Sequence, residues 1–269
     1  MRRSISARFA STLLILLVAA CAGPDADMQE GAVVTVFEGA RLLTGEGEVI
    51  EDAVFVVTDD RFTSVGAAGD VAIPDGATRV DLAGKTVMPA IVNAHIHLAN
   101  EREARARQLR HMAYYGAGTV VSLGLDEGDV AFEMRGVSVD DGARSLTAGR
   151  GITTPEPGRS EVPYWVTTPE EARSAVGELA ARPVDIVKIW VDDRGGQYER
   201  LSPELYGAVI DEAHANDLKV TAHIFRLEDA KGLLRAGIDA FAHGIRDQDV
   251  DDEVVSLWLE RPDVVLVPN

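Results

Sequence analysis

The chain has 269 residues, of which 46% are apolar, 26 are basic and 44 are acidic, so its formal net charge at pH 7 is −18. This length and apolar fraction suffice for a sizeable core in one large domain or two modest ones. A surface this acidic repels nucleic acid and anionic lipid headgroups, so nucleic acid is not an expected partner.

The first twenty residues have the pattern of a secretory signal peptide. Arg2, Arg3 and Arg8 precede the apolar run of residues 13–20, which is too short to span a bilayer and has the order of regions found in export signals. The run ends at Cys21, the single cysteine, so no disulfide can form within the chain.

The segment "LVAAC" at residues 17–21 resembles the lipobox of bacterial lipoproteins. The resemblance implies that Cys21 is lipidated and that the protein is an exported, membrane-anchored lipoprotein, located in the periplasm, at the outer membrane or on the cell surface. An ordinary signal peptide with a coincidental cysteine is the alternative. Residues 21–31 are polar and contain Gly and Pro, which suits a flexible linker behind the anchor.

Residues 32–86 are expected to form a small β domain, a β-sandwich. Short runs with β character, separated by turn residues, occupy positions 33–43, 51–60, 61–68 and 78–84, and no helical pattern interrupts them. Beyond this region the pattern changes, so residues 87–269 are predicted to be a second domain.

In the second domain, apolar strands alternate with amphipathic helices. The seven strand candidates are residues 87–97, 118–124, 144–151, 184–193, 219–225, 240–245 and 264–269. Strands that are apolar on both faces and alternate with helices indicate a parallel α/β sheet, and the number of repeats favours a (β/α)8 barrel over an open doubly wound sheet. No Gly-rich phosphate loop is present, which argues against a dinucleotide or nucleotide enzyme.

The helices between these strands carry clear end signals. The segment 167–179 has Thr168 as N-cap, a proline directly after it and Glu171 completing a capping box. The segment 201–218 begins with Ser202 followed by proline, and the segment 227–237 ends at a glycine.

Four of the six histidines lie near the carboxyl ends of predicted strands, the end at which barrel enzymes build their sites. They are His95, His97, His223 and His243. His95 and His97 are two residues apart in one strand, so both point to the same side, as two ligands of one metal would. Each histidine alone could be an ordinary core residue, but their shared position predicts a metal site. His111 and His214 fall in helical patterns and are expected to be surface or packing residues.

Lys188 stands in the apolar strand "VDIVKIW". An unpaired ammonium group is not tolerated in such a strand, so the lysine must be neutral, paired or modified. An ion pair with Asp185 or Asp192 is the simplest alternative to a functional role.

The segments "VMPAIVNAHIHL", "VDIVKIWVDD", "VTAHIF" and "FAHG", in this order, resemble the metal-dependent amidohydrolase superfamily, in particular its imidazolonepropionase-like and prolidase-like group. The resemblance implies two divalent metals, with zinc as the first choice. His95 and His97 would be ligands of the first metal, and His223 and His243 ligands of the second. It also implies that Lys188 is carboxylated and bridges both metals with a hydroxide, so catalytic roles fall to Lys188 and His243.

The sequence departs from the family pattern in three places. An eighth strand and its aspartate, expected after residue 269, do not occur in the chain, which leads us to expect a truncated piece of a longer protein, with a shortened, inactive homologue as the alternative. Ala90 replaces a usual glycine and Asn93 a common aspartate; neither change removes a ligand.

The expected function is hydrolysis of an amide or peptide-like C–N bond in a dipeptide, an acyl-amino acid or a cyclic amide. An esterase, lactonase or phosphotriesterase with the same two-metal site is one alternative, and a non-catalytic binding lipoprotein is another. The loops 149–166 and 192–201 are expected to contact the small-molecule or short-peptide substrate, with Arg150, Tyr164 and Tyr198 as candidates. The oligomeric state stays open, a homo-oligomer included.

Overall fold

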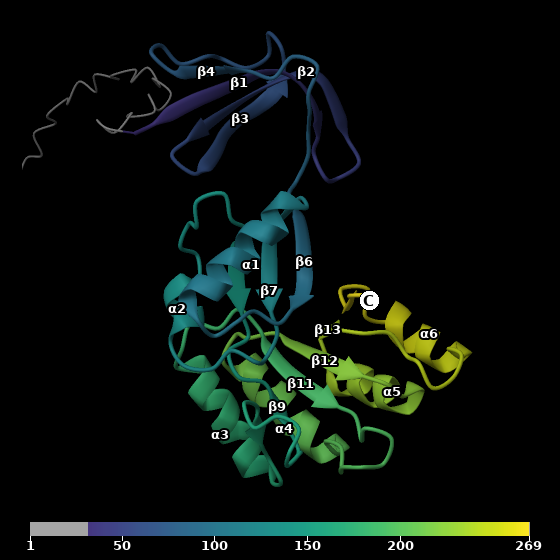
Figure 1. Ribbon diagram of the computed structural model, residues 1–269. Helices are drawn as coiled ribbons and strands as arrows, with labels where there is room; N and C mark the ends of the chain where they lie inside the picture. The colour runs from purple at the N-terminus through teal and green to yellow at the C-terminus, as the bar shows by residue number, and fades with distance from the viewer. Residues whose placement is uncertain (1–31, 269) are drawn as a thin grey trace, which may run out of the picture. The chain divides into compact units, whose positions relative to one another are not determined.

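The computed structural model describes residues 32–268, so the expected signal peptide, the Cys21 lipidation site and the linker lie outside the described residues. The chain divides into two compact units between Pro89 and Ala90 (Figure 1). The sequence placed the domain boundary slightly earlier, after residue 86, and that assignment stays a prediction.

The first unit is a mixed five-stranded β-sheet. Its strands are β1 (Val34–Leu43), β2 (Val49–Thr58), β3 (Arg61–Ala67), β4 (Thr78–Asp81) and β5 (Thr86–Val87). The order is β3-β2-β1-β4, and β5 also pairs with β1. The first three strands are antiparallel neighbours, whereas β4 and β5 run parallel to β1. The expected β character is confirmed, but the sandwich is not, because the described strands of this unit form one sheet.

The second unit alternates parallel strands with helices. Its strands are β6 (Ile91–Ile96), β7 (Ala117–Ser122), β8 (Arg144–Thr147), β9 (Ile152–Thr153), β10 (Tyr164–Trp165), β11 (Val187–Val191), β12 (Val220–Ile224), β13 (Ala240–Phe241) and β14 (Val265–Leu266). Its helices are α1 (Arg102–Tyr114), α2 (Val130–Met134), α3 (Pro169–Ala180), α4 (Pro203–Ala215), α5 (Leu227–Ala236) and α6 (Asp252–Leu259). Each of the seven predicted strand segments contains an observed strand, so the α/β alternation is confirmed.

The strands of this unit form two parallel sheets, one ordered β6-β7-β8 and the other β10-β9-β11-β12-β13-β14. A hydrogen bond of 2.8 Å from the amide of Asp185 to the carbonyl of Thr147 connects the end of β8 to the segment that leads into β11. Over residues 90–268 the sheets do not close into a barrel. The strand predicted over 144–151 is interrupted, because Gly149 adopts a φ of +60° there and the chain resumes as β9.

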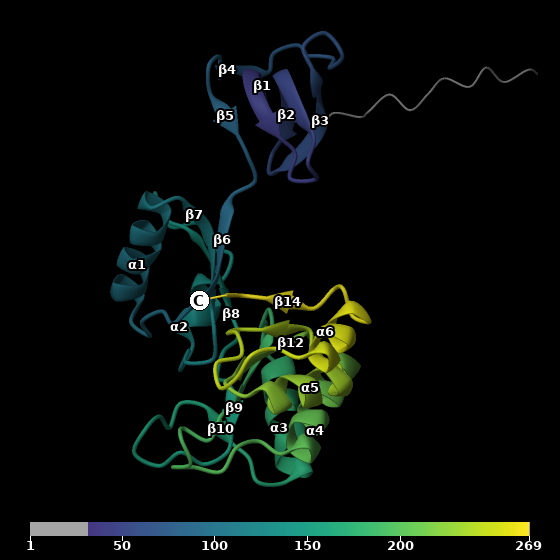
Figure 2. The same ribbon diagram turned by 90° about the vertical axis from the view of Figure 1, so that its right-hand side faces the viewer.

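The helix signals read from the sequence are present. Thr168 and Glu171 form the capping box of α3, the hydroxyl of Ser202 caps α4, and Gly237 ends α5 in the left-handed conformation. Helices α3, α4 and α5 cover one face of the sheet, and their apolar residues form the main core with β11 and β12 (Figure 2). This core is what holds the carboxyl ends of β11 and β12 in place.

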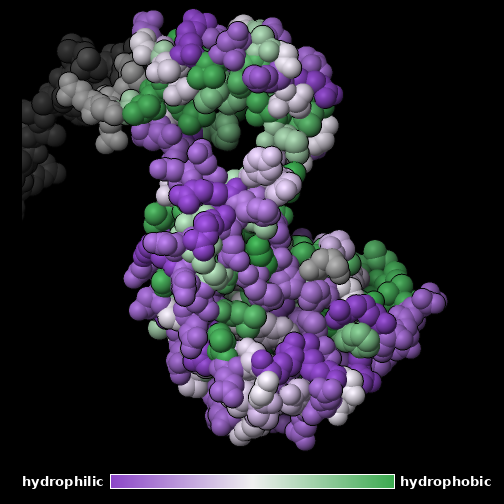
Figure 3. Space-filling model, viewed as in Figure 1, coloured by the Kyte–Doolittle hydropathy of each residue, from purple (hydrophilic) through white to green (hydrophobic). Residues whose placement is uncertain are grey.

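An apolar surface remains over α6. Val250, Val255 and Leu259 are exposed there, and the hydrophobic colouring over this helix is visible in Figure 3. Within the described part of the chain, none of the helices has the length and apolar character needed to span a bilayer.

Candidate metal centre

The four histidines expected from the sequence lie together. His95 is in β6 and His97 follows it, His223 is in β12, and His243 comes just after β13. Because these strands run parallel, their carboxyl ends lie at one end of the unit. The four side chains line a cavity of about 370 Å³, together with Arg159 and Arg194.

The histidine rings contact one another within this cavity. The ring centroids of His95 and His97 are 5.2 Å apart, those of His95 and His243 are 4.7 Å apart, and those of His223 and His243 are 4.6 Å apart. The sequence, by strand alternation alone, could pair only the first two. The structure adds that His243 lies in ring contact with both His95 and His223.

Hydrogen bonds orient two of these rings. Nδ1 of His95 lies 3.3 Å from the carbonyl oxygen of Ala242, and Nε2 of His223 lies 2.8 Å from Oδ2 of Asp192. A histidine bonded through one ring nitrogen presents the other nitrogen to a ligand. These contacts fix the orientation of the His95 and His223 rings within the cavity.

Burial keeps these imidazoles neutral. It lowers the pKa of His95 to about 4 and that of His223 to about 3, and the charge of Lys188 adds to the effect in both cases. The pKa of His97 is lowered for the same two reasons. Neutral imidazole is the form that ligates metal, so the lowered pKa values favour ligation by these three rings at neutral pH.

Lys188 lies in β11 with its side chain fully buried, and its Nζ has no hydrogen-bond partner among the described residues. The ion pair considered as an alternative is not formed. Asp185 pairs with Arg135 at 2.6 Å, and Asp192 pairs with Arg194 at 2.7 Å. Burial, with a smaller contribution from the charge of Arg194, lowers the pKa of Lys188 from 10.5 to about 7.

The residues present fit a metal centre, although the ligands are not yet arranged around one. Throughout residues 32–268, no group of three or more His, Cys, Asp or Glu side chains is placed to hold a metal ion as it stands. The rings lie in contact with one another instead. The fit rests on the donor chemistry, which combines four imidazoles with a buried amine that has no hydrogen-bond partner in residues 32–268.

A group of charged residues beside the histidines was not foreseen from the sequence. Glu156 is 2% exposed and accepts hydrogen bonds from Arg159 at 2.6 Å and from Arg194 at 3.1 Å. Its neighbours line a second cavity of about 420 Å³, which shares His97, Arg159 and Trp190 with the first and adds Thr153. The sequence indicates these charged residues only through their position, since they lie in the two loops expected to contact substrate.

A second buried network supports the end of β6. Arg105 of α1 and Asp126 form an ion pair of 2.8 Å in which both side chains are fully buried. Asp126 also accepts hydrogen bonds from Ser122 at 2.8 Å and from Thr147. Ser122 in turn accepts a hydrogen bond of 3.2 Å from the amide of Leu98, the residue after His97. The network thus ties the His97 segment to β7 and β8.

The three substrate candidates lie outside the histidine cavity. Arg150 stacks over the ring of Tyr164 at 4.0 Å and donates to the carbonyl of Val162, and Tyr198 donates to the carbonyl of Pro157 at 3.2 Å. These contacts order the loops around the cavity, and a direct role in binding substrate stays a prediction for all three residues.

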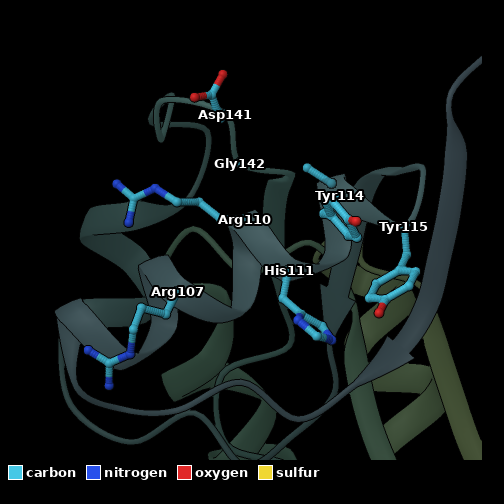
Figure 4. A pocket seen from close by; sticks show the side chains of 8 residues that line it. Arg107, Arg110, His111, Tyr114, Tyr115, Asp141 and Gly142 are labelled. Atoms are coloured by element: carbon cyan, nitrogen blue, oxygen red, sulfur yellow. The ribbon is translucent and has the colours of Figure 1, made fainter.

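The remaining two histidines lie away from the site, as expected. His214 contacts Asp239 at 2.9 Å, and His111 packs against the ring of Tyr115. His111 also lines a cavity of about 880 Å³ at the C-terminal end of α1, with Arg107, Arg110 and Tyr114 (Figure 4). This cavity contains none of the predicted metal ligands, and it lies at the helix end remote from the carboxyl end of β6.

The site therefore consists of histidines at the carboxyl ends of strands in a parallel α/β unit. No model of a known protein family matches the chain. An uncharacterised Mycobacterium tuberculosis protein is 29% identical over 221 residues, which are 79% of this chain and 56% of that protein. Imidazolonepropionase of Micrococcus luteus is 33% identical over 136 residues, which are 48% of this chain and 31% of the enzyme.

A crystal structure from Bifidobacterium longum, provisionally described as a prolidase, superposes with a TM-score of 0.72 at 29% identity, covering 86% of this chain and 58% of that one. The chain therefore spans just over half the length of the relatives that it matches along most of its own length. The chain is similar in sequence to imidazolonepropionase and in fold to a crystal structure described as an amidohydrolase, and these named relatives are enzymes.

Proposed function

We propose that the protein is a metal-dependent hydrolase that cleaves an amide or peptide-like C–N bond. The observation that carries this proposal is Lys188, a fully buried amine without a hydrogen-bond or ion-pair partner among the described residues, on a strand next to the one that carries His223. Its Nζ lies 5.4 Å from the ring centroid of Trp190. A structural lysine would not be buried in this way, because burial of an uncompensated ammonium group is costly. Carboxylation turns the amine into an anionic metal ligand and removes that cost.

Carboxylation of Lys188 needs no reactant other than carbon dioxide. The nitrogen lone pair forms a bond to carbon dioxide, and the proton lost from nitrogen passes to solvent. Only the uncharged amine can react, and the lowered pKa of Lys188 makes this form abundant at neutral pH.

We infer that His95 and His97 would hold one divalent metal and His223 and His243 a second, with carboxylated Lys188 as a further ligand, and that these donors suit zinc. When bound, such metals supply a water nucleophile and polarise the scissile carbonyl. The residues of the chain orient the site: Asp192 fixes the ring of His223, and the carbonyl of Ala242 fixes that of His95.

The proposal also covers the fold and the membrane attachment of the protein. We infer that the parallel strands of residues 90–268 belong to an amidohydrolase (β/α) barrel, and that the protein is exported and anchored to a membrane through lipid on Cys21. Labelling with a radioactive fatty acid, compared between the wild type and Cys21→Ala, tests the anchor. Label that persists in the variant would contradict it.

The hydrolase proposal is tested on the intact protein, purified without chelator and compared before and after metal removal. The panel contains dipeptides, N-acyl-amino acids and cyclic amides, with lactones and phosphotriesters as the alternative substrates. We expect amide hydrolysis that is lost on metal removal and restored by zinc. Faster cleavage of lactones or phosphotriesters would favour the alternative reaction, and hydrolysis that survives complete metal removal would contradict the proposal.

A further inference from the structure

We propose that Arg159 and Arg194 bind a carboxylate group of the substrate beside the predicted metal ligands. The inference rests on the proposed hydrolase function and narrows it to amides that carry a free carboxylate, such as N-acyl-amino acids and dipeptides. Cyclic amides without an acid group, lactones and phosphotriesters would then be poor ligands.

Both arginines lie where a bound substrate would be. They line the cavity that contains the four histidines, and Arg159 also lines the adjoining cavity. They come from different loops, Arg159 from the loop between β9 and β10 and Arg194 from the loop between β11 and α4. Two loops that are distant in sequence thus bring two guanidinium groups to one cavity wall.

Glu156 holds the two arginines together. Its two carboxylate oxygens are bonded to different arginines, Oε2 to Nη1 of Arg159 and Oε1 to Nε of Arg194. Because Glu156 is almost completely buried, its carboxylate is held in place, and one nitrogen of each arginine is bonded to it. Glu156 acts as a positioning residue, since it contacts the arginines rather than the ligand.

The cavity walls carry donors that lack acceptors. Nη2 of Arg194 and Oγ1 of Thr153 are buried without a hydrogen-bond partner among the described residues. The side chain of Arg159 is 45% exposed and forms its single hydrogen bond within the described chain through Nη1, which leaves Nε and Nη2 for another acceptor. An unpaired buried donor costs free energy that a suitable ligand recovers.

A carboxylate matches this arrangement better than a neutral group does. It has acceptor oxygens and no donors, and a guanidinium group binds it through two parallel N–H bonds. An amide, ester or lactone presents a single weaker acceptor. The mismatch between donors and acceptors in the cavity therefore predicts selectivity for acids.

The test measures binding, so it does not depend on turnover. Titration calorimetry on the intact, zinc-loaded protein compares N-acetyl-L-leucine, N-acetyl-L-phenylalanine and N-acetyl-L-proline with their carboxamides. We expect the acids to bind at least about tenfold more tightly, because hydrogen bonds to charged groups are the stronger ones. Arg194→Gln and Arg159→Gln should each reduce this preference to about twofold or less, whereas Arg173→Gln on α3 should leave it unchanged.

Equal affinity for acids and carboxamides, a preference that persists in both cavity variants, or no binding of any of these probes would overturn the proposal. Arg159→Gln keeps the test valid if Arg194→Gln fails to fold, because the side chain of Arg159 is 45% exposed, against 13% for Arg194. Arginine-dependent binding of acids without any hydrolysis would refute the hydrolase function and leave this site standing. Hydrolysis without a preference for acids would support the hydrolase function and refute the carboxylate site.

Discussion

Oδ2 of Asp192 lies 2.8 Å from Nε2 of His223, and both side chains are only 11% exposed. Nη1 of Arg194 is 3.2 Å from the same ring nitrogen, but Nε2 cannot donate to Asp192 and accept from Arg194 at once. The shorter distance, and the 2.7 Å pair between Arg194 and Asp192 itself, favour donation from His223 to Asp192. The carboxylate thereby selects the tautomer that leaves Nδ1 for a metal.

Removing this carboxylate should weaken metal binding. Asp192→Ala is expected to lower metal affinity by about 10–100-fold, the usual effect of losing a partner that orients a ligating histidine. Competition with a fluorescent zinc chelator measures the affinity directly. The matched control is Asp211→Ala, an exposed aspartate of α4 that should leave the affinity unchanged. Equal zinc affinity in Asp192→Ala and the wild type would show that the contact does not orient a ligand.

The metal-free protein should be stabilised by Lys188→Met, and the gain should depend on pH. The folded-state pKa of Lys188 is about 7, below the ordinary 10.5, so the unfolded state binds more protons between these values. The free energy of unfolding of the wild type therefore rises with pH across this window, and above it the buried lysine is neutral in both states. The advantage of the Lys188→Met variant, on the order of a few kcal/mol near pH 7, should fade as the pH approaches the ordinary lysine pKa.

Denaturant unfolding at a series of pH values from about 6 to about 10, which spans most of the interval between the folded and unfolded lysine pKa, measures this effect. The solutions contain chelator and are depleted of carbon dioxide. The wild type loaded with zinc and supplied with bicarbonate is the comparison, and it should lose the pH dependence. A constant difference between wild type and variant across the whole range would mean that the pKa of Lys188 is not lowered in the folded protein.

The buried pair of Arg105 and Asp126 should show strong coupling. Asp126→Ala or Arg105→Met alone should each cost about 3–5 kcal/mol, because each leaves an uncompensated buried charge. The double variant should cost much less than the sum of the two. The exposed pair of Arg173 and Glu212, at 3.5 Å, is the control, with an expected coupling of about 0–1 kcal/mol. Additive effects of the two buried substitutions would contradict this account.

Replacing Gly151 by even the next larger residue, alanine, should destabilise the protein. A methyl group at this position would overlap the ring of Trp190, which lines both cavities beside the histidines. Gly151→Ala is expected to cost about 1–3 kcal/mol and to displace Trp190 from the cavity wall. Gly177→Ala in α3 meets no atom within 4 Å and should be neutral or stabilise the protein by up to about 1 kcal/mol. Thermal melts of both variants separate the two outcomes.

The sequence predicted the features that depend on local pattern. The capping box of α3 needs only Thr168 and Glu171, and the clustering of the histidines follows because parallel strands share one carboxyl end. It also predicted that Lys188 would be buried, since an apolar strand surrounds it.

The features that depend on distant contacts were missed. Arg105 and Asp126 are 21 residues apart, and Glu156 and Arg194 are 38 residues apart, so no spacing rule connects them. Asp192 was considered only as a partner for Lys188, whereas the structure pairs it with His223 and Arg194. The interruption between β8 and β9 was missed as well, because it depends on the positive φ of Gly149.

The most direct test of the central claim is the metal content of the intact protein, purified without chelator and measured by mass spectrometry of the elements. The account predicts two divalent metals per chain in the wild type, and loss of one of them in His95→Ala and in His223→Ala. Folded wild-type protein without bound transition metal, or histidine variants that keep both metals, would contradict it.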